Sequence, residues 1–203
     1  MKETEMAKLY FKYGAMGSSK TASALITKFN YEERGMKVWL IKPATDTRDG
    51  DDVIKSRIGL SATCRAIDKN EDVVEVFKNE ALGVDAIICD ECQFFTAEQI
   101  DGFRRIVDEA GLPVLCFGLR TDFLTHSFPG SARLFEVADS IAEIKTICEC
   151  GRKATVNARI SPDGKVVTKG RQVFLGGNDR YLAMCHRCWK NRINSERTIE
   201  DED

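Results

Sequence analysis

Eight residues near the start of the chain have the composition of a phosphate-binding loop. They read Gly14-Ala15-Met16-Gly17-Ser18-Ser19-Lys20-Thr21. An apolar run precedes them and a helix-like stretch follows, which is the order of strand, loop and helix around such loops. There, backbone N–H groups and the helix N-terminus surround the phosphates, the lysine reaches the β- and γ-phosphate oxygens, and the threonine hydroxyl binds Mg²⁺. The loop predicts a site for Mg·ATP.

Ser19 departs from the usual pattern, which has glycine before the lysine. We expect Ser19 to take a right-handed conformation at the helix entry, where its Cβ limits how closely a phosphate approaches. A Lys-Thr pair after a glycine-containing turn also occurs at ordinary helix starts. The loop alone therefore leaves both interpretations open.

Two acidic residues, Asp90 and Glu91, follow the apolar run Ala86–Cys89. In Mg·ATP sites a carboxylate at the end of a buried strand holds the metal, usually through its water shell, and Asp90 fits that role. Glu91 can accept a proton from a hydroxyl nucleophile. Taken alone, such a pair is more often a set of solvated loop charges, but a phosphate-binding loop upstream favours the site.

Four cysteines form two close pairs, and they are Cys148, Cys150, Cys185 and Cys188. In a chain without an export signal, paired cysteines indicate a metal before a disulfide. Four thiolates suit tetrahedral Zn²⁺, and a closed site of this kind is structural because it leaves no open position for catalysis. An isolated zinc knuckle can also bind nucleic acid, which the balanced charge disfavours. The remaining cysteines, expected to be buried free thiols, are Cys64, Cys89, Cys92 and Cys116.

Apolar runs that alternate with helical patterns must position these residues. The expected strands are Ala7–Tyr13, Lys37–Lys42, Val84–Cys89, Val114–Gly118 and Ile141–Ile147. The expected helices are one after the loop, one around Val73–Asn79 and one at Thr96–Ala110 that ends at Gly111. Strands alternating with helices imply an α/β fold with a parallel sheet flanked by helices.

The character of the sequence changes near Cys148. Two strand-like runs, Thr155–Ile160 and Lys165–Thr168, flank Ser161-Pro162-Asp163-Gly164, which predicts a β-hairpin. We therefore expect an ATP-binding domain over residues 7–144 and a small zinc-binding domain over 145–192. The acidic residues that end the chain predict a solvated, disordered tail over 193–203.

The bulk properties fit a soluble globular protein of ordinary size. The chain has 203 residues, of which 43% are hydrophobic, and no run long enough to span a membrane. Its net charge of -2 and the lack of a basic block argue against a large nucleic-acid footprint. The N-terminus has no apolar segment of the kind that directs secretion. We expect a cytoplasmic protein with no membrane or nucleic-acid partner.

Further candidates lie in loops after the expected strands. Asp46-Thr47-Arg48 follows the second strand, and Arg48 can contact a phosphate, although a lone surface arginine is the simpler interpretation. Phe94, Phe123 and Phe128 are aromatic residues near strand ends, where open α/β sheets bind ligands. Packing in the core is an equally good explanation for each of them.

Together these residues resemble the thymidine kinases of the second type. The matching stretches are Gly14–Thr21, Lys42–Arg48, Asp90–Phe95, Thr121–Phe123, Phe128–Gly130, the cysteine pairs and Gly176–Tyr181. They span residues 7 to about 190. Asp-Glu-x-Gln-Phe-Phe and Gly-Gly-x-x-x-Tyr are the specific motifs. Cys-x-Cys departs from the Cys-x-x-Cys common in that family.

The resemblance implies a RecA-like P-loop fold and transfer of the γ-phosphoryl group of ATP to the 5′-hydroxyl of thymidine. It implies that Lys20 binds phosphate, Thr21 and Asp90 serve Mg²⁺, and Glu91 is the catalytic base. Asp46, Thr47, Arg48 and Gln93 then lie at the ATP site. The implied nucleoside site comprises Phe94, Phe123, Phe128, Gln172, Val173, Phe174, Leu175, Gly176 and Tyr181.

The resemblance further implies a homotetramer and a structural zinc that anchors the loop over the nucleoside. Two alternatives remain open at this point. One is a P-loop ATPase whose zinc knuckle acts on nucleic acid. The other is a degenerate protein that no longer binds ATP and serves as a zinc-stabilised scaffold.

Overall fold

A six-stranded sheet forms the centre of the computed structural model, which describes residues 6–48, 50–172 and 181–200. The strand order is β5-β2-β6-β7-β1-β8, and every neighbouring pair is parallel. The strands are β1 (Leu9–Tyr13), β2 (Val38–Pro43), β5 (Arg65–Ile67), β6 (Ala86–Cys89), β7 (Val114–Gly118) and β8 (Ser140–Glu143). The predicted α/β class with a parallel sheet is confirmed.

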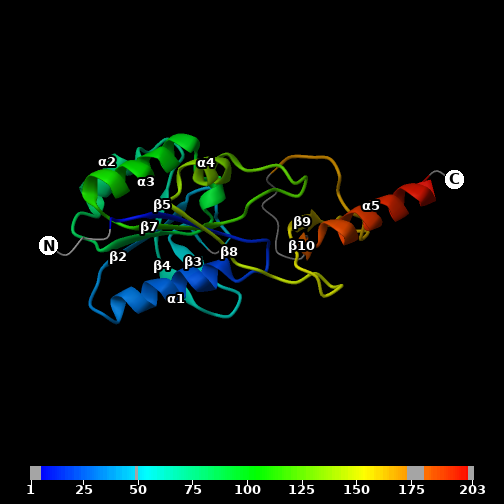
Figure 1. Ribbon diagram of the computed structural model, residues 1–203, viewed down its shortest axis with the longest axis horizontal. Coiled ribbons are helices and arrows are strands. Elements are labelled where there is room, and N and C mark those ends of the chain that lie inside the picture. The colour runs from blue at the N-terminus through cyan, green and yellow to red at the C-terminus, as the bar shows by residue number, and fades with distance from the viewer. Residues whose placement is uncertain (1–5, 49, 173–180, 201–203) are drawn as a thin grey trace.

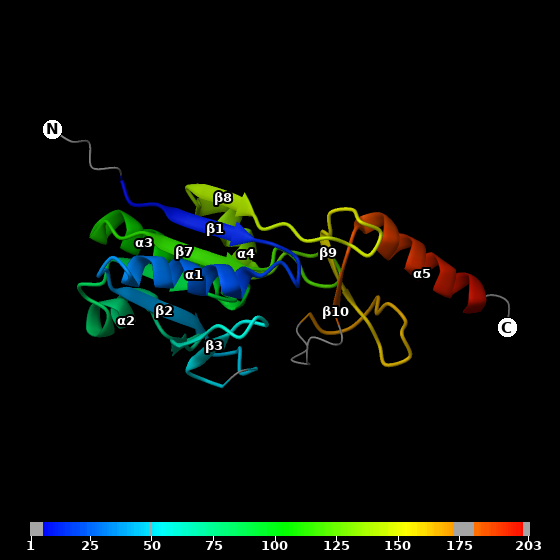
Figure 2. The same ribbon diagram turned by 90° about the horizontal axis from the view of Figure 1, so that it is seen from below.

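Helices cover both faces of this sheet (Figures 1 and 2). One face carries α1 (Lys20–Glu32), and the other carries α2 (Val73–Glu80), α3 (Ala97–Ala110) and α4 (Pro129–Val137). Alternate residues of β6 serve the two cores: Ile87 packs with α2, α3 and α4, whereas Ile88 packs with α1. Because both faces are buried, the central strands are continuously apolar.

The start and the end of α3 follow from local chemistry. The Thr96 hydroxyl accepts the N–H of Gln99 at 3.2 Å, and the Gln99 side chain accepts the N–H of Thr96 at 3.2 Å. Gly111 ends the helix with a φ of 64°, a left-handed conformation that glycine adopts without steric cost. The predicted boundaries of this helix are confirmed.

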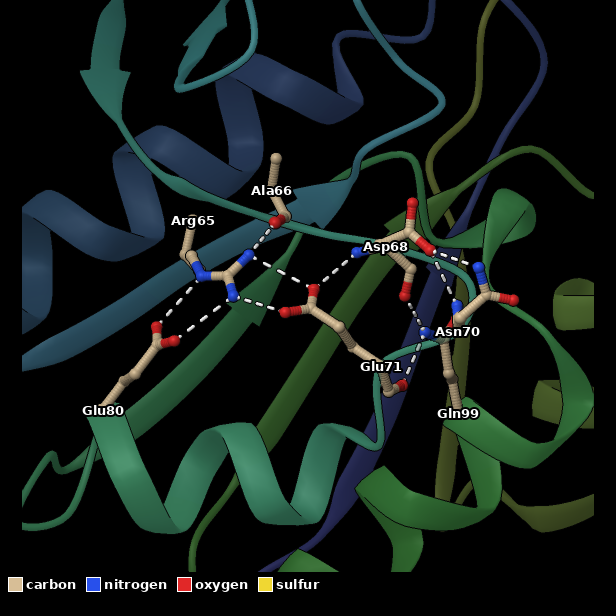
Figure 3. A network of polar contacts seen from close by, with 7 residues as sticks. All are labelled: Arg65, Ala66, Asp68, Asn70, Glu71, Glu80 and Gln99. Carbon is tan, nitrogen blue, oxygen red and sulfur yellow. Dashed lines mark hydrogen bonds and ion pairs between the residues drawn. The ribbon is translucent and has the colours of Figure 1, made fainter.

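A polar network ties the edge strand β5 to the helical layer (Figure 3). Arg65 forms ion pairs with Glu71 at 2.6 Å and with Glu80 at 3.0 Å, at the two ends of α2. The Gln99 amide of α3 donates to the carbonyls of Asp68 and Glu71. Strand β5 is thereby joined to α2 through Glu80, and the loop between β5 and α2 is joined to α3.

A smaller unit lies beyond the carboxyl ends of the strands (Figure 1). It contains the antiparallel strands β9 (Val156–Arg159) and β10 (Tyr181–Met184) and the helix α5 (His186–Glu200). Its separate apolar cluster includes Val156, Met184, Trp189 and Ile193. Trp189 and Ile193 anchor α5, whose helix runs to Glu200 and so overlaps the segment 193–203 that was predicted as a tail. Residues 201–203 lie outside the described part.

The predicted hairpin is only partly correct. The turn forms, with the N–H of Gly164 donating to the Ser161 carbonyl at 2.9 Å and a φ of 86° at Gly164. The two arms pair only next to the turn, through the antiparallel bridge Ile160–Val166 and two backbone hydrogen bonds of 2.9 Å, from Ser161 to Lys165 and from Val167 to Arg159. The run Lys165–Thr168 is not a strand, and β9 pairs along its length with β10, which the sequence did not predict.

Two other strand predictions differ from the structure. The run Ile141–Ile147 stops being a strand after Glu143, because Ile147 instead pairs antiparallel with Lys153 at the entrance of the first cysteine pair. The antiparallel hairpin of β3 (Val53–Lys55) and β4 (Ser61–Thr63) was not expected from the sequence. Strand β3 and the turn that follows it border the cavity described below.

Candidate functional site

The loop Gly14–Thr21 joins the end of β1 to the start of α1, as its pattern predicts. Its first N–H, from Gly14, donates to the Gly118 carbonyl at the end of β7 at 3.2 Å. A Cβ on Gly14 would lie 2.4 Å from the Ile144 carbonyl oxygen, so only glycine fits there. The loop is therefore fixed at its first residue against two neighbouring strands.

Ser19 contradicts the expected right-handed conformation. Its φ of 60° and ψ of 29° are left-handed, two residues after Gly17, whose φ is 72°. The chain has to reverse between β1 and α1, and the turn places a residue with positive φ directly before the helix. For an L-residue this conformation costs about 1–2 kcal/mol. Glycine at this position would adopt the same conformation without strain.

Lys20 lies with its ammonium turned back onto its own loop. Its Nζ donates to the Ala15 carbonyl at 2.8 Å and contacts the Ser18 hydroxyl at 3.4 Å. Burial lowers the pKa of Lys20, and the nearby charges of Glu91 and Asp90 oppose that shift. A phosphate offers this buried ammonium a better partner than a neutral carbonyl.

Asp90 stands at the end of β6, with β7 between that strand and β1. It is 3% exposed, and it shares a hydrogen bond with the Thr21 hydroxyl. Burial and the charge of Glu91 raise the pKa of Asp90 to about 7, against the opposing effect of Thr21 and Lys20. The two residues predicted to serve Mg²⁺ therefore lie side by side.

Glu91 has a left-handed backbone, with a φ of 50°. Its carboxylate forms an ion pair with Arg48 and accepts the Gln93 amide at 2.5 Å. Burial favours the protonated form, but Arg48 and then Lys20 outweigh it, so the pKa of Glu91 is lowered. Arg48 also pairs with Asp46 at 2.6 Å. Strained, charge-paired residues of this kind gather at functional sites.

Gln93 connects this carboxylate to the next strand. It is 1% exposed, and its Oε1 accepts the N–H of Leu119, just after β7, at 2.9 Å. A Cβ on Gly118 would lie 2.6 Å from that oxygen and 2.6 Å from the Cys92 sulfur. Because Gly118 has no side chain, the space that the Gln93 side chain occupies stays open.

A cavity of about 860 Å³ opens over these residues, within the range of small-molecule sites. The predicted site residues that line it are Met16, Gly17, Ser19, Lys20, Thr21, Asp46, Arg48, Asp90, Glu91, Gln93, Phe94, Phe123, Phe128, Gln172 and Tyr181. Gly14, Ala15, Ser18 and Thr47 do not line it. Val173, Phe174, Leu175 and Gly176 lie outside the described residues.

The phenylalanine residues Phe94, Phe123 and Phe128 line the cavity. Phe94 and Phe128 meet edge to face, with ring centroids 5.6 Å apart, and the Arg159 guanidinium lies 5.4 Å from the Phe123 ring. Asp122 shapes the segment Thr121–Phe128 by accepting the N–H groups of Leu124 and His126. The polar residues predicted for ATP and the aromatic ones predicted for the nucleoside thus share one cavity.

Several lining residues were not predicted, among them Arg57 and Asn157. Arg57 belongs to the β3–β4 turn, whose Ser-Arg-Ile-Gly sequence is a turn signal. It lies close to Gly17. Asn157 interrupts an apolar strand, and a buried polar residue in such a run is the one signal that could have marked it.

The two cysteine pairs come together in the smaller unit. The sulfur atoms of Cys148, Cys150, Cys185 and Cys188 all lie within 4.8 Å of one another. The Cys150 and Cys185 sulfurs are 3.6 Å apart, close to the edge of about 3.8 Å of a tetrahedron with 2.3 Å Zn–S bonds. The four residues fit a structural zinc ion. Cys64, Cys89, Cys92 and Cys116 are buried free thiols, as predicted.

A parallel sheet with a phosphate-binding loop after β1 and paired carboxylates after β6 defines a P-loop nucleotide-binding protein. The thymidine kinase family model matches residues 7–189. The thymidine kinase of Novosphingobium aromaticivorans is 45% identical over 184 residues, which are 90% of this chain and 96% of that protein. Those of Yersinia pestis and Zymomonas mobilis are both 42% identical over 192 residues, covering 94% of this chain and 98% and 100% of theirs.

The chain therefore belongs to the thymidine kinase family. The match runs from β1 through the second cysteine pair. It therefore includes the phosphate-binding loop, the aromatic residues of the cavity and the candidate zinc site. Among the described residues, no helix has the length and apolar character needed to cross a membrane.

Proposed function

We propose that this protein transfers the γ-phosphoryl group of Mg·ATP to the 5′-hydroxyl of thymidine, which gives thymidine monophosphate for nucleoside salvage. Membership of the thymidine kinase family supports the substrates. The single observation that carries the chemistry is the juxtaposition of Lys20 and Thr21 with Asp90 and Glu91 in one cavity. Phosphoryl transfer needs mainly positioning and charge neutralisation, and these residues can supply both.

The donor half of the site is the loop Gly14–Thr21. The loop N–H groups and Lys20 bind the phosphates, with Lys20 exchanging the Ala15 carbonyl for phosphate oxygens. Thr21 and Asp90 hold Mg²⁺, which when bound neutralises charge on the phosphates. The cation favours the ionised form of Asp90, whose pKa is otherwise about 7.

Glu91 is the base that takes the proton of the 5′-hydroxyl. Its low pKa keeps it ionised at neutral pH, but the ion pair with Arg48 makes it a weak base. The phosphates of bound ATP would compete with Glu91 for Arg48 and so free the carboxylate. Gln93 keeps Glu91 oriented at the junction of the substrates.

The aromatic residues of the cavity bind the nucleoside. Phe94, Phe123 and Phe128 supply apolar walls, and the segment from Gln172 to Gly176 with Tyr181 closes over the base. The zinc ion is structural in this proposal and anchors that segment through Cys185 and Cys188. The protein acts as a cytoplasmic homotetramer.

A kinase assay tests the proposal directly. Purified protein with Mg²⁺ and ATP labelled at the γ-phosphate is offered a panel of nucleosides, and labelled thymidine monophosphate is the expected product. The absence of any phosphorylated deoxynucleoside refutes the proposal. DNA-stimulated ATP hydrolysis without a nucleoside product would instead identify a nucleic-acid-dependent ATPase.

A further inference from the structure

The side chain of Asn157 hydrogen-bonds both to the phosphate-binding loop and to the segment Thr121–Phe128. It belongs to β9 of the smaller unit and is only 3% exposed. Its Oδ1 accepts the N–H of Met16, in the phosphate-binding loop, at 2.8 Å. Its Nδ2 donates to the Thr121 carbonyl, at the start of the Thr121–Phe128 segment, at 2.8 Å. These partners are 141 and 36 residues away in the sequence.

The bond to Met16 acts on the peptide group that also holds the phosphate-binding lysine. The carbonyl of that peptide belongs to Ala15 and accepts the Lys20 ammonium at 2.8 Å. One peptide unit is therefore held by Lys20 on its carbonyl side and by Asn157 on its N–H side. Hydrogen bonds in such a chain polarise and strengthen one another.

The chemistry of the two bonds requires a short side-chain amide. A carboxylate supplies acceptors only and a lysine donors only, whereas asparagine presents one acceptor and one donor group in a fixed plane. A flipped amide would set its NH₂ against the Met16 N–H and its oxygen against the Thr121 carbonyl. The two partners thus fix the orientation of Asn157, and that orientation fixes their spacing.

We propose that Asn157 is a positioning residue that sets the phosphate-binding loop against the Thr121–Phe128 segment, so that the smaller unit aligns the donor site as well as the acceptor site. The inference rests on the proposed function for the identity of the acceptor. It gives the zinc-site unit a second role, because β9 carries Asn157 into the main cavity. Nothing in this role requires Asn157 to touch the reacting atoms.

The decisive variant is Asn157→Ala, with Thr146→Val as the matched control. The Thr146 hydroxyl, which lies outside the phosphate-binding loop, also donates to that loop, to the Gly17 carbonyl at 3.3 Å. That hydrogen bond is exposed to solvent. Three quantities are measured: hydrogen exchange of the Met16 amide, the affinity for Mg·ATP by calorimetry, and the KM for thymidine. None of them depends on the fraction of active protein as kcat does.

We expect Asn157→Ala to speed Met16 exchange at least tenfold, and to weaken Mg·ATP binding and raise the thymidine KM about five- to tenfold each. Thr146→Val should leave all three within about twofold. Asn157→Thr suits a strand and supplies one hydroxyl that can hydrogen-bond, so it serves if the alanine variant does not fold. We expect it to weaken Mg·ATP binding and raise the thymidine KM by about two- to fourfold.

Unchanged affinities in a folded Asn157→Ala protein, whether or not kcat falls, would overturn the inference. The exchange and ATP-binding readouts keep this outcome separate from a failure of the proposed function. If the wild-type protein phosphorylates no thymidine but both readouts change as expected, the kinase assignment fails and the positioning of the loop by Asn157 stands.

Discussion

Replacing Ser19 with glycine should stabilise the protein, because Ser19 holds a left-handed backbone that glycine adopts freely. Relief of the strain is worth about 1–2 kcal/mol. Glycine also gives the unfolded chain more freedom, which costs about 0.4–1 kcal/mol. Among the described residues the Ser19 side chain makes no capping hydrogen bond to α1, so little else is lost. The expected net gain in the free energy of unfolding is about 0.5–1 kcal/mol.

Urea and thermal unfolding of Ser19→Gly and Ser19→Ala separate the effect of the Cβ from that of the hydroxyl. The alanine variant keeps the strained Cβ and should match the wild type within about 0.5 kcal/mol. The glycine variant should unfold about 1–4 °C higher. It should also bind Mg·ATP at least as tightly, since the cavity loses a Cβ. A destabilised glycine variant, or equal gains in both variants, would refute the strain argument.

Three further predictions concern the carboxylates and the zinc site. Glu91→Gln should lower kcat by about 10²–10⁴-fold while calorimetry shows retained Mg·ATP binding, and a loss under tenfold would exclude Glu91 as the base. The raised pKa of Asp90, about 7, stabilises the Mg²⁺-free fold at low pH, and this contribution is lost as the pH rises through 7. Asp90→Asn removes the charge, so its Tm advantage over the wild type should grow between pH 5 and pH 8, and a constant difference would contradict the assignment. Cys185→Ser or mild chelation should raise the thymidine KM and leave the six-stranded sheet folded by circular dichroism, because that sheet has its own core, whereas global unfolding would disprove this independence.

The parts of the site that sequence could predict are those encoded within a few neighbouring residues. The loop Gly14–Thr21 carries its own order of strand, glycines and lysine, and Asp90 directly follows the strand that buries it. The cysteine pairs are recognisable from their spacing, and in the structure the two pairs lie together. The capped helix beginning at Ala97 was predictable for the same reason.

The parts that sequence could not predict depend on partners remote in the chain. The pairing of β9 with β10 joins residues near 156–159 to residues near 181–184, whereas the turn at Pro162-Asp163-Gly164 is local and forms as predicted. The role of Asn157 depends on its hydrogen bonds with Met16 and Thr121, which are remote in the sequence. The left-handed turn at Ser19 likewise follows from the path between β1 and α1, which composition does not encode.

The pair Asp90 and Glu91 shows how one fold gives two adjacent acids opposite properties. Asp90 is buried and Glu91 is mostly buried, and each charge disfavours the other, so without further partners only one would ionise readily. Arg48 and Lys20 settle the competition by lowering the pKa of Glu91, and the proton is left to Asp90. In the proposed mechanism Asp90, once ionised, would hold Mg²⁺, and the phosphates of ATP would compete with Glu91 for Arg48. The ion pair with Arg48 would thus keep Glu91 a weak base in the empty site, and ATP binding would release it.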